Sequence, residues 1–285
     1  FHKRFGDFDM HLMAGTTAEN TKRLSQTHWG YNFITSGTIS FNNIAKTNQF
    51  FKDGTSRKRL VGFYGEYGVS YKNMAYLTVT GRNDWSSTLP VKEHSYFYPS
   101  VSGSFLFSEL LPKDSPISYG KVRASWAKVG KDADPYATLT YVTSPMIYGN
   151  YVGVGNQYTA GNAYLKPEIQ TAWEIGLEMR FLNNRIGFDW TYYHSSTENQ
   201  IAQPRLSNAN GYILSSINSG SVINKGMEVS ITGKPILKKD FRWETALNFS
   251  YNRGTLGTFL DGVGMFYPTD AQFGSVKSAS VPNGG

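Results

Sequence analysis

The 285-residue sequence contains no cysteine, few charged residues and no long apolar run. The absence of cysteine excludes a disulfide scaffold and thiolate-bound zinc or iron–sulfur centres. Charged residues make up only 17% of the chain, whereas aromatic residues reach 15%. This argues against disorder, because disordered chains are rich in charge and poor in aromatic residues. No stretch of about 18 uncharged apolar residues occurs, so the sequence predicts no transmembrane helix.

The abundant residues disfavour helices. The chain has 19 Tyr, 18 Phe, 6 Trp and 29 Gly, and aromatic residues and glycine are poor helix formers. We therefore expect an all-β protein. Composition alone leaves three architectures open, namely a secreted sandwich, a soluble barrel and a membrane barrel.

Apolar residues alternate with polar ones at a period of two. Between 173 and 181 every second residue is apolar, and the residues between them are polar or glycine. This pattern predicts a strand with one exposed face. Asn183 and Asn184 are the predicted two-residue turn, because asparagine tolerates positive φ. The alternation resumes over 186–192.

The same design recurs along the chain. Hairpins are predicted at 60–84, with a turn at Lys72 and Asn73, and at 227–251, with a turn around 238–240. Weaker strands are predicted near 5–15, 97–108 and 118–129. The total is about nine strands, most of them about eight to fourteen residues long, which exceeds the usual five to six residues of soluble sheets.

The predicted connections alternate in length. Short ones lie at 72–73, 109–117, 183–184 and 237–240, and long polar ones lie at 16–58, 85–96, 130–168 and 204–223. Outer-membrane barrels have this asymmetry, with short periplasmic turns and long extracellular loops. A soluble sandwich has no reason to place every long loop at one end. Strand length and loop asymmetry therefore favour an antiparallel transmembrane β-barrel.

Aromatic residues along the last predicted strand agree with a membrane span. Phe241 and Trp243 lie near the short turn, and Phe249 and Tyr251 lie near the long loop. Ten residues at ~3.3 Å each, tilted by ~40°, rise about 25 Å, which is the height of the apolar band of a membrane barrel. The residues that we expect to face lipid are Trp173, Leu177, Phe188, Trp190, Leu247 and Phe249.

Several sequence blocks lie on these strands and at their ends. They are 81–87 (Gly-Arg-Asn-Asp-Trp-Ser-Ser), 162–168 (Asn-Ala-Tyr-Leu-Lys-Pro-Glu), 173–178 (Trp-Glu-Ile-Gly-Leu-Glu), 219–230 (Ser-Gly-Ser-Val-Ile-Asn-Lys-Gly-Met-Glu-Val-Ser) and 247–252 (Leu-Asn-Phe-Ser-Tyr-Asn). In this order and combination, over most of the chain, they resemble SusC/RagA-like TonB-dependent outer-membrane transporters.

The resemblance implies a barrel of roughly 22 strands in the outer membrane of a Gram-negative, Bacteroidetes-like bacterium, filled by an N-terminal plug. It also implies import of nutrients such as oligosaccharides or peptides, energised through TonB, with a SusD-like surface lipoprotein as partner. Neither enzyme activity nor a cofactor is expected. The chain matches only the middle-to-late barrel, so we expect residues 1–285 to be a partial barrel domain without plug or terminal strands. A passive porin-like barrel and a secreted carbohydrate-binding β-sandwich are the alternatives.

The net charge of +7 could indicate an anionic partner. However, the basic residues are scattered, and their densest run is Arg57, Lys58 and Arg59. We therefore expect dispersed, solvated positions and no nucleic-acid partner. Outer-membrane lipid is the expected surrounding of the apolar side of the strands.

Catalytic and metal-binding patterns are weak. Glu174 and Glu178 would be about 13 Å apart on a strand, which is too far for a glycosidase pair at about 5–9.5 Å. We expect them to be polar groups that line the lumen. The five histidines form no local metal motif. Asp132 and Asp134 could supply oxygens to calcium, but an Asp-Pro turn is the expected role of this segment.

Candidate ligand contacts are aromatic residues on the long loops and near the outer strand ends. A sugar ring can stack on tyrosine or tryptophan while neighbouring polar side chains bond its hydroxyl groups. By position the candidates are Trp29, Tyr31, Trp85, Tyr148, Tyr151, Tyr158 and Tyr164. Packing between loops is the alternative role of each. The segments 82–87 and 166–168, where strands meet long loops, are expected either to anchor loops or to take part in transport.

Overall fold

The alternating pattern forms long antiparallel strands in the computed structural model, which describes residues 1–112, 114–142, 146–148 and 151–259. The predicted hairpin around Asn183 and Asn184 pairs Leu177 with Trp190. The predicted two-residue turn is wrong in length: the connection spans four residues, 182–185, and Leu182 has positive φ together with both asparagines, at 53°, 56° and 63°. The hydrophobic alternation specifies this register, because a slip of one residue would move every apolar side chain to the opposite face.

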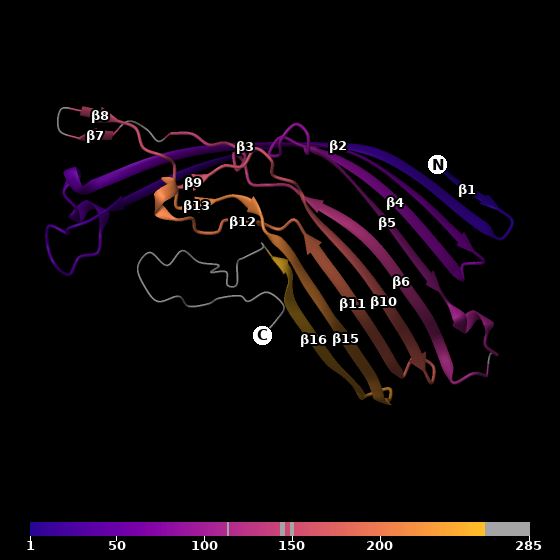
Figure 1. Ribbon diagram of the computed structural model, residues 1–285. Helices are drawn as coiled ribbons and strands as arrows, with labels where there is room; N and C mark the ends of the chain where they lie inside the picture. Colours follow the sequence, from indigo (N-terminus) through magenta and orange to yellow (C-terminus); the bar gives the residue numbers. More distant parts are fainter. Residues whose placement is uncertain (113, 143–145, 149–150, 260–285) are drawn as a thin grey trace.

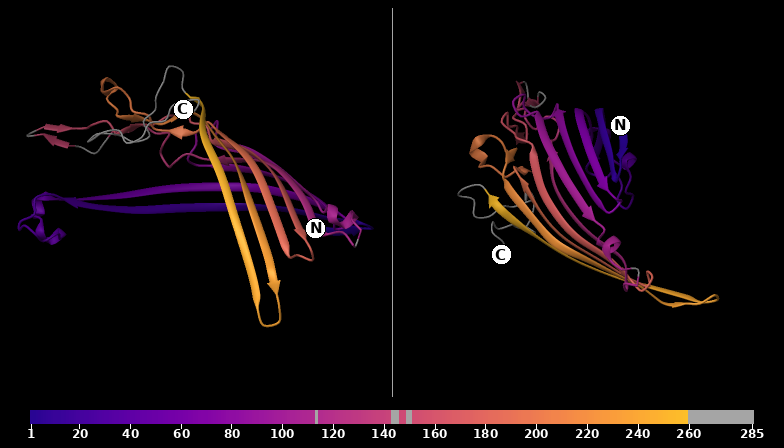
Figure 2. Two further views of the ribbon diagram at one scale, coloured as in Figure 1. Left: turned by 90° about the horizontal axis from the view of Figure 1, so that it is seen from below. Right: turned by 90° about the vertical axis from the view of Figure 1, so that its right-hand side faces the viewer.

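Ten strands form one antiparallel sheet (Figure 1). In spatial order they are β1 (His2–Phe5), β2 (Phe8–Gly30), β3 (Gln49–Tyr71), β4 (Ala75–Ser86), β5 (Ser95–Phe105), β6 (Ile117–Lys131), β10 (Glu168–Phe181), β11 (Ile186–Glu198), β15 (Gly220–Leu237) and β16 (Arg242–Phe259). The spatial order follows the chain, so the topology is an up-and-down meander. The right-hand view of Figure 2 shows the sheet curved into an open trough. A single curved sheet excludes the sandwich, which needs two sheets packed face to face.

Shorter elements lie in the connections. β7 (Met146–Tyr148) pairs with β8 (Tyr151–Gly153), β12 (Ile201–Ala202) pairs with β14 (Ile217–Asn218), and β9 (Thr159–Ala160) runs parallel to β13 (Leu214–Ser215). Four 3₁₀ helices span Phe41–Asn43, Lys46–Asn48, Phe107–Leu110 and Asn208–Asn210. Within the described residues, no helix is long and apolar enough to cross a membrane.

Connections of different length lie at opposite ends of the sheet. At one end, which we call the turn end, the strands are joined by residues 6–7, 72–74, 106–116, 182–185 and 238–241. At the other end, the loop end, they are joined by residues 31–48, 87–94, 132–167 and 199–219. The predicted asymmetry is confirmed, with the one exception that 106–116 is longer than 87–94.

The prediction of a long loop at 16–58 is wrong. β2 and β3 have 23 residues each and stay paired up to Gly30 and Gln49, so the connection is only 31–48. β4 accompanies β3 only as far as Leu60. Beyond that point β2 and β3 continue as a two-stranded ribbon, which the left view of Figure 2 shows projecting past its neighbours. The ribbon carries polar residues on both faces apart from Leu24 and its aromatic tip at Trp29, Phe50 and Phe51, so no apolar alternation marks it in the sequence.

The strand number and lengths also exceed the prediction. β1 is a tenth strand, of 4 residues, which pairs with the start of β2. Five strands are longer than the predicted limit, namely β2 and β3 at 23 residues, β6 at 15, and β15 and β16 at 18. Their extra length lies mainly at the loop end, above the apolar residues.

The sheet separates apolar from polar side chains. One row of directly paired residues, which defines the apolar face, runs through Phe8, Tyr71, Ala75, Phe105, Val122, Leu177, Trp190, Val229 and Phe249. The adjacent row, on the opposite, polar face, runs through Ser70, Tyr76, Ser104, Arg123, Gly176, Thr191, Glu228 and Ser250. A soluble sheet would have to cover the first of these rows with protein.

The six residues predicted to face lipid all lie on the apolar face. None of them is buried, and Leu247 and Phe249 are 67% and 53% exposed. The described hydrophobic residues that are buried together lie instead at the loop end, and they are Leu89, Tyr96, Ala133 and Leu165. No closed core therefore covers the apolar face in the described part of the chain, and lipid contact stays a prediction.

Candidate functional site

The polar face holds most of the acidic residues of the ten strands. Only Asp53 and Glu198 lie on the apolar face. The others point to the polar face, and they are Asp9, Glu19, Glu66, Asp84, Glu168, Glu174, Glu178, Asp189, Glu228 and Glu244. Together with the serine and threonine hydroxyl groups between them, they make this face a hydrogen-bonding wall.

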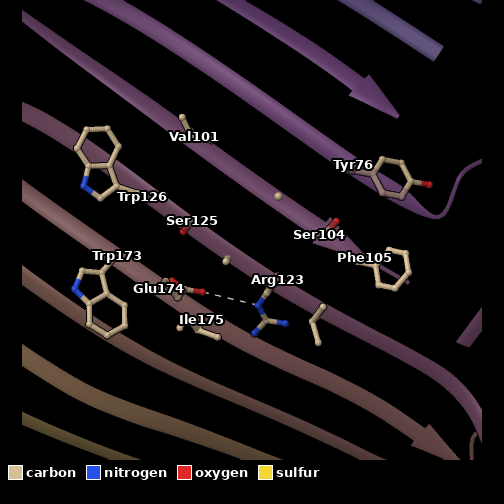
Figure 3. Close-up of a pocket in the computed structure, with 13 residues that line it drawn as sticks. Tyr76, Val101, Ser104, Phe105, Arg123, Ser125, Trp126, Trp173, Glu174 and Ile175 are labelled. Carbon is tan, nitrogen blue, oxygen red and sulfur yellow. Dashed lines mark ion pairs between the residues drawn. The ribbon is translucent and has the colours of Figure 1, made fainter. Parts of the chain in front are cut away.

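Arg123 is the centre of an ion-pair network on this wall. Its guanidinium donates two hydrogen bonds to Asp189, at 2.8 and 3.2 Å, and one to the Thr191 hydroxyl at 2.5 Å. Glu174 lies 3.8 Å from Arg123 Nε, and Figure 3 marks this ion pair. Two-pronged bonding to a carboxylate fixes orientation as well as distance, so the network joins β6, β10 and β11 in one geometry.

Arg123 reaches Asp189 by lying across β10. Its direct partner on β10 is Gly176, whose partner on β11 is Thr191. A Cβ added to Gly176 would collide with the Arg123 Nε. Glycine at 176 therefore lets the guanidinium lie flat against the wall. The sequence signals this contact only by an arginine and an aspartate at polar-face positions. These two residues can be matched only once the register of β6, β10 and β11 is known.

Arg82 makes a similar crossing nearer the loop end. It donates from Nε to Asp84 at 2.8 Å and from Nη2 to the Thr17 hydroxyl at 2.8 Å. On the way it crosses β3 at Gly62, where an added Cβ would collide with its Nη2. The Tyr98 hydroxyl donates to the second oxygen of Asp84, which is only 4% exposed. A carboxylate this buried needs such partners in place of water.

Asp132 ties three segments together at the loop end. Its carboxylate accepts hydrogen bonds from Lys58 Nζ at 2.6 Å, from the Thr88 hydroxyl at 3.2 Å and from the Ser86 hydroxyl. Ser86 and Thr88 are 2% and 3% exposed. The donors belong to β3, to the end of β4 and to the 87–94 connection. Asp134, by contrast, starts a turn in which its carbonyl accepts from Ala137 N at 3.2 Å, as the Asp-Pro pattern predicts.

Glu168 and Asn218 anchor the two longest connections. Glu168 bonds Lys131 Nζ at 3.2 Å and accepts from the Ile201 backbone N–H at 2.8 Å. Asn218 exchanges two hydrogen bonds with the Lys166 backbone, both at 2.9 Å. Both segments that the sequence singles out at the strand–loop junctions therefore act as loop anchors.

A groove of about 730 Å³ lies over β5, β6 and β10 (Figure 3). Val101, Trp126 and Trp173 around it form one row of the apolar face. Gly103 and Ala124 form part of the next row, and their small size leaves the hollow. We assign this groove to the apolar face, where it adjoins the surface predicted to face lipid.

The structure distributes the predicted ligand residues over separate elements. Trp29 and Tyr31 lie together at the ribbon tip, where each stacks on Phe50 with ring centroids 5.5 and 5.8 Å apart. Trp85 lies on the apolar face opposite Val61. A tryptophan in that position belongs to the upper rim of the apolar residues, not to the polar wall.

The other predicted ligand residues lie in the 132–167 connection. Tyr151 is on β8, Tyr158 precedes β9 and Tyr164 precedes β10, and their exposed fractions are 81%, 43% and 84%. Tyr148 is on β7, and its side chain lies outside the described part. All four stand at the loop end, and ligand contact remains a prediction for every residue of the set.

Glu174 and Glu178 lie on the polar face, as predicted for lumen-lining groups. Glu174 pairs with Arg123, and Glu178 pairs with Arg180 at 2.9 Å. The two carboxylates are thus engaged by different arginines and do not face a common reacting centre. Over the described ranges, no group of three His, Cys, Asp or Glu side chains gathers as a metal site.

One polar face, one apolar face, long strands and long loops at a single end define a segment of an outer-membrane type β-barrel. The chain belongs to the TonB-dependent receptor-like β-barrel family, whose model matches residues 3–282. The resemblance predicted from the sequence blocks is thereby confirmed.

Named relatives agree with this family. The chain is 27% identical over 278 residues to the TonB-dependent receptor P3 of Formosa agariphila, covering 93% of this chain and 27% of that protein. It is 30% identical over 228 residues to the TonB-dependent receptor SusC of Bacteroides thetaiotaomicron, covering 76% and 22%. A solved structure of the RagAB peptide transporter has the same fold, with a TM-score of 0.79 at 20% identity, covering 92% of this chain and 29% of that one. The chain thus spans less than a third of the length of these relatives.

Proposed function

We propose that this chain is part of the barrel of a TonB-dependent receptor that imports nutrients across the outer membrane of a Gram-negative bacterium. Residues 1–285 are then a partial barrel domain, and the plug and the remaining strands belong to the same, longer receptor. The short coverage of the relatives supports this. So does the open sheet, in which β1 and β16 each have one neighbour, because an unpaired strand edge is unfavourable in lipid.

The division of the sheet into two faces carries the proposal. An unbroken apolar row across nine strands, left uncovered by the described protein, suits contact with acyl chains. The polar face then lines the lumen. Its arginines are largely neutralised by neighbouring carboxylates, so the groups free to bind a passing solute are mostly hydroxyl and amide groups. Such a wall suits a neutral, hydrogen-bonding cargo, an oligosaccharide or a peptide.

The loop end, with its anchored connections, is the proposed extracellular face. A SusD-like lipoprotein would cover it, and TonB would act through the plug from the opposite side. The anchors at Asp132, Glu168 and Asn218 support a fixed geometry for these loops during repeated docking. Import of this kind is binding followed by displacement of the plug, so no covalent step is assigned to any residue of the chain.

Single cysteines test the assignment of the two faces, and the chain itself has no cysteine to interfere. In the receptor that contains this chain, reconstituted in lipid vesicles, Leu247→Cys is compared with Asn248→Cys, its neighbour on the polar face. We expect a fluorophore at 247 to be quenched by brominated lipid and one at 248 to be quenched by a water-soluble reagent. Equal quenching of both sites by the aqueous reagent would contradict the membrane assignment.

Uptake tests the transport part separately. A strain that lacks the receptor gene is expected to lose growth on a limiting oligosaccharide or peptide source, and the intact gene restores it. Restoration by a receptor whose TonB-contacting segment is deleted would favour a passive porin-like barrel and would remove the energised part of the proposal.

A further inference from the structure

Basic side chains lie on the apolar face where its continuous apolar residues give way to polar ones, toward the loop end. Single apolar residues follow farther along the same face, at Leu24, Phe51, Ile169 and Ile223. We call the basic side chains the cation collar, and they are Lys22, Arg57, Arg59, Lys128, His194, Lys225 and Arg253. The Lys and Arg side chains of this set have no ion-pair or hydrogen-bond partner in the described part of the chain. This contrasts with Arg82 and Arg123 on the polar face, which are held by carboxylates.

The collar places like charges directly opposite each other. Lys225 on β15 pairs with Arg253 on β16. On the ribbon, Lys22 pairs with Arg57. Direct cross-strand pairs of like charge are destabilising. An anion bound between them would relieve this repulsion.

The collar residues lie at the upper edge of the continuous apolar residues on β2, β3, β6, β11, β15 and β16, whereas β4, β5 and β10 contribute no cation to it. On β3 the last apolar residue below it is Val61, two residues from Arg59, and on β16 it is Tyr251, two residues from Arg253. Lys128 likewise follows Trp126 by two residues on β6. The collar is therefore a property of the boundary, not of one strand.

Arg59 on β3 and Arg253 on β16, at opposite sides of the sheet, lie at one height once the strands are tilted. The row of directly paired residues that starts at Arg253 passes through Trp173 and reaches Tyr67 on β3. From β16 to β3 there are seven strand steps, and Arg59 lies eight residues beyond Tyr67 (67 − 59). Eight residues span ~26 Å along a strand, and seven spacings span ~34 Å across it. A tilt of ~38° therefore levels Arg59 with Arg253, within the roughly 35–45° of outer-membrane barrels.

We propose that the cation collar binds the phosphate groups of lipid headgroups in the outer leaflet. The inference rests on the proposed function, which places the loop end outside the cell. Guanidinium and ammonium groups donate strong hydrogen bonds to phosphate oxygens. Cations at the edge of an apolar surface lie where headgroups lie. The indole rings of Trp126, two residues below Lys128, and of Trp173, beside His194, suit the same interface.

The position of the collar favours a lipid phosphate over other anions as its partner. A soluble polyanion or an acidic protein that reached Lys225 and Arg253 would have to approach the apolar face, directly above Met227 and Tyr251. A lipid phosphate is delivered to that place by its own acyl chains. The two acids on this face, Asp53 and Glu198, lie farther toward the loop end than the cations of their own or neighbouring strands.

The test compares retained lipid in two purified variants of the receptor that contains this chain. Lys225→Gln combined with Arg253→Gln removes two collar charges. Lys238→Gln combined with Lys239→Gln removes two exposed charges at the turn end and is the matched control. Each protein is stripped in detergent and mixed with phosphorylated lipid A or with the same lipid A after phosphatase treatment, and bound lipid is counted by native mass spectrometry.

We expect the collar variant to bind phosphorylated lipid A about thirtyfold more weakly than the parent, the effect of two interfacial cations. The control variant should bind it as the parent does, and dephosphorylated lipid should bind all three proteins weakly and alike. Equal loss in both variants, or equal binding of the two lipids by the parent, would overturn the inference. Displacement of the lipid by equimolar inorganic phosphate would also overturn it, because the site would then take any free phosphate.

Failure of this inference and failure of the proposed function give different results. Lipid retention is measured on purified protein, whereas import is measured in cells. A parent protein that retains phosphorylated lipid but restores no growth leaves the collar in place and removes the import assignment. A parent protein that imports but binds both lipids equally would keep the import assignment and remove the collar inference.

Discussion

Replacement of Leu247 by lysine is the sharpest test of the membrane-facing surface. Leu247 lies on the apolar face of β16 and is 67% exposed. It is four residues from Tyr251 and six from Phe241, which for strands tilted by ~40° places it about 10 Å below one aromatic ring and about 15 Å above the other. A lysine near the bilayer midplane of a membrane barrel costs ~2–4 kcal/mol, a decrease of about 30- to 700-fold in the folding equilibrium.

The adjacent residue supplies the control for this measurement. Asn248 points to the polar face, where its partner is Ser230, so Asn248→Lys keeps the new charge in water and should change the unfolding free energy little. Both variants of the receptor are folded into phosphatidylcholine vesicles and unfolded with denaturant. The reasoning is refuted if Leu247→Lys and Asn248→Lys have the same unfolding free energy.

Two further substitutions test the polar wall and the loop anchors. Gly176→Leu should displace Arg123 from Asp189, because the new side chain occupies the path of the guanidinium. Arg123→Leu should then cost less stability in that background than in the parent, and an undiminished cost would show that the crossing is not needed. Asp132→Asn should weaken the hold on the 87–94 connection and increase amide hydrogen exchange there, whereas Asp134→Asn, in the neighbouring turn, should not. Identical exchange in the two variants would contradict the anchoring role.

The sequence predicts the strands best where one side of a strand is apolar throughout. Over 173–192 the alternation specifies both strands and their facing, and the observed pairing of Leu177 with Trp190 follows from it, although the predicted two-residue turn is a four-residue connection. The requirement is physical, since only one register places every apolar side chain on the same face. The same argument fails above the apolar boundary, where Thr21, Lys22 and Arg23 give no contrast between the two faces of the ribbon.

Contacts that depend on three strands lie beyond sequence patterns. Arg123 crosses β10 at Gly176, whose partner on β11 is Thr191, and so reaches Asp189, which itself pairs with Glu178 on β10. No spacing along the chain signals this, because the residues are separated by two connections of unrelated length. The loop anchors could be predicted in part from the sequence. Their segments stand out in the sequence, but the partners of Asp132, such as Lys58, come from distant strands.

The net charge of +7 takes a different meaning once each strand residue is assigned to a face. The sequence suggests dispersed, solvated cations, because Lys and Arg recur along the whole chain. In the ten strands, however, eleven basic residues face ten acidic ones on the polar face, whereas seven face only two on the apolar face. The wall is therefore close to neutral, and most of the excess charge of the strands lies on the apolar face. A barrel that keeps its lumen balanced and its outer boundary cationic can pass uncharged solutes without trapping them, and still attract the phosphates of the surrounding leaflet.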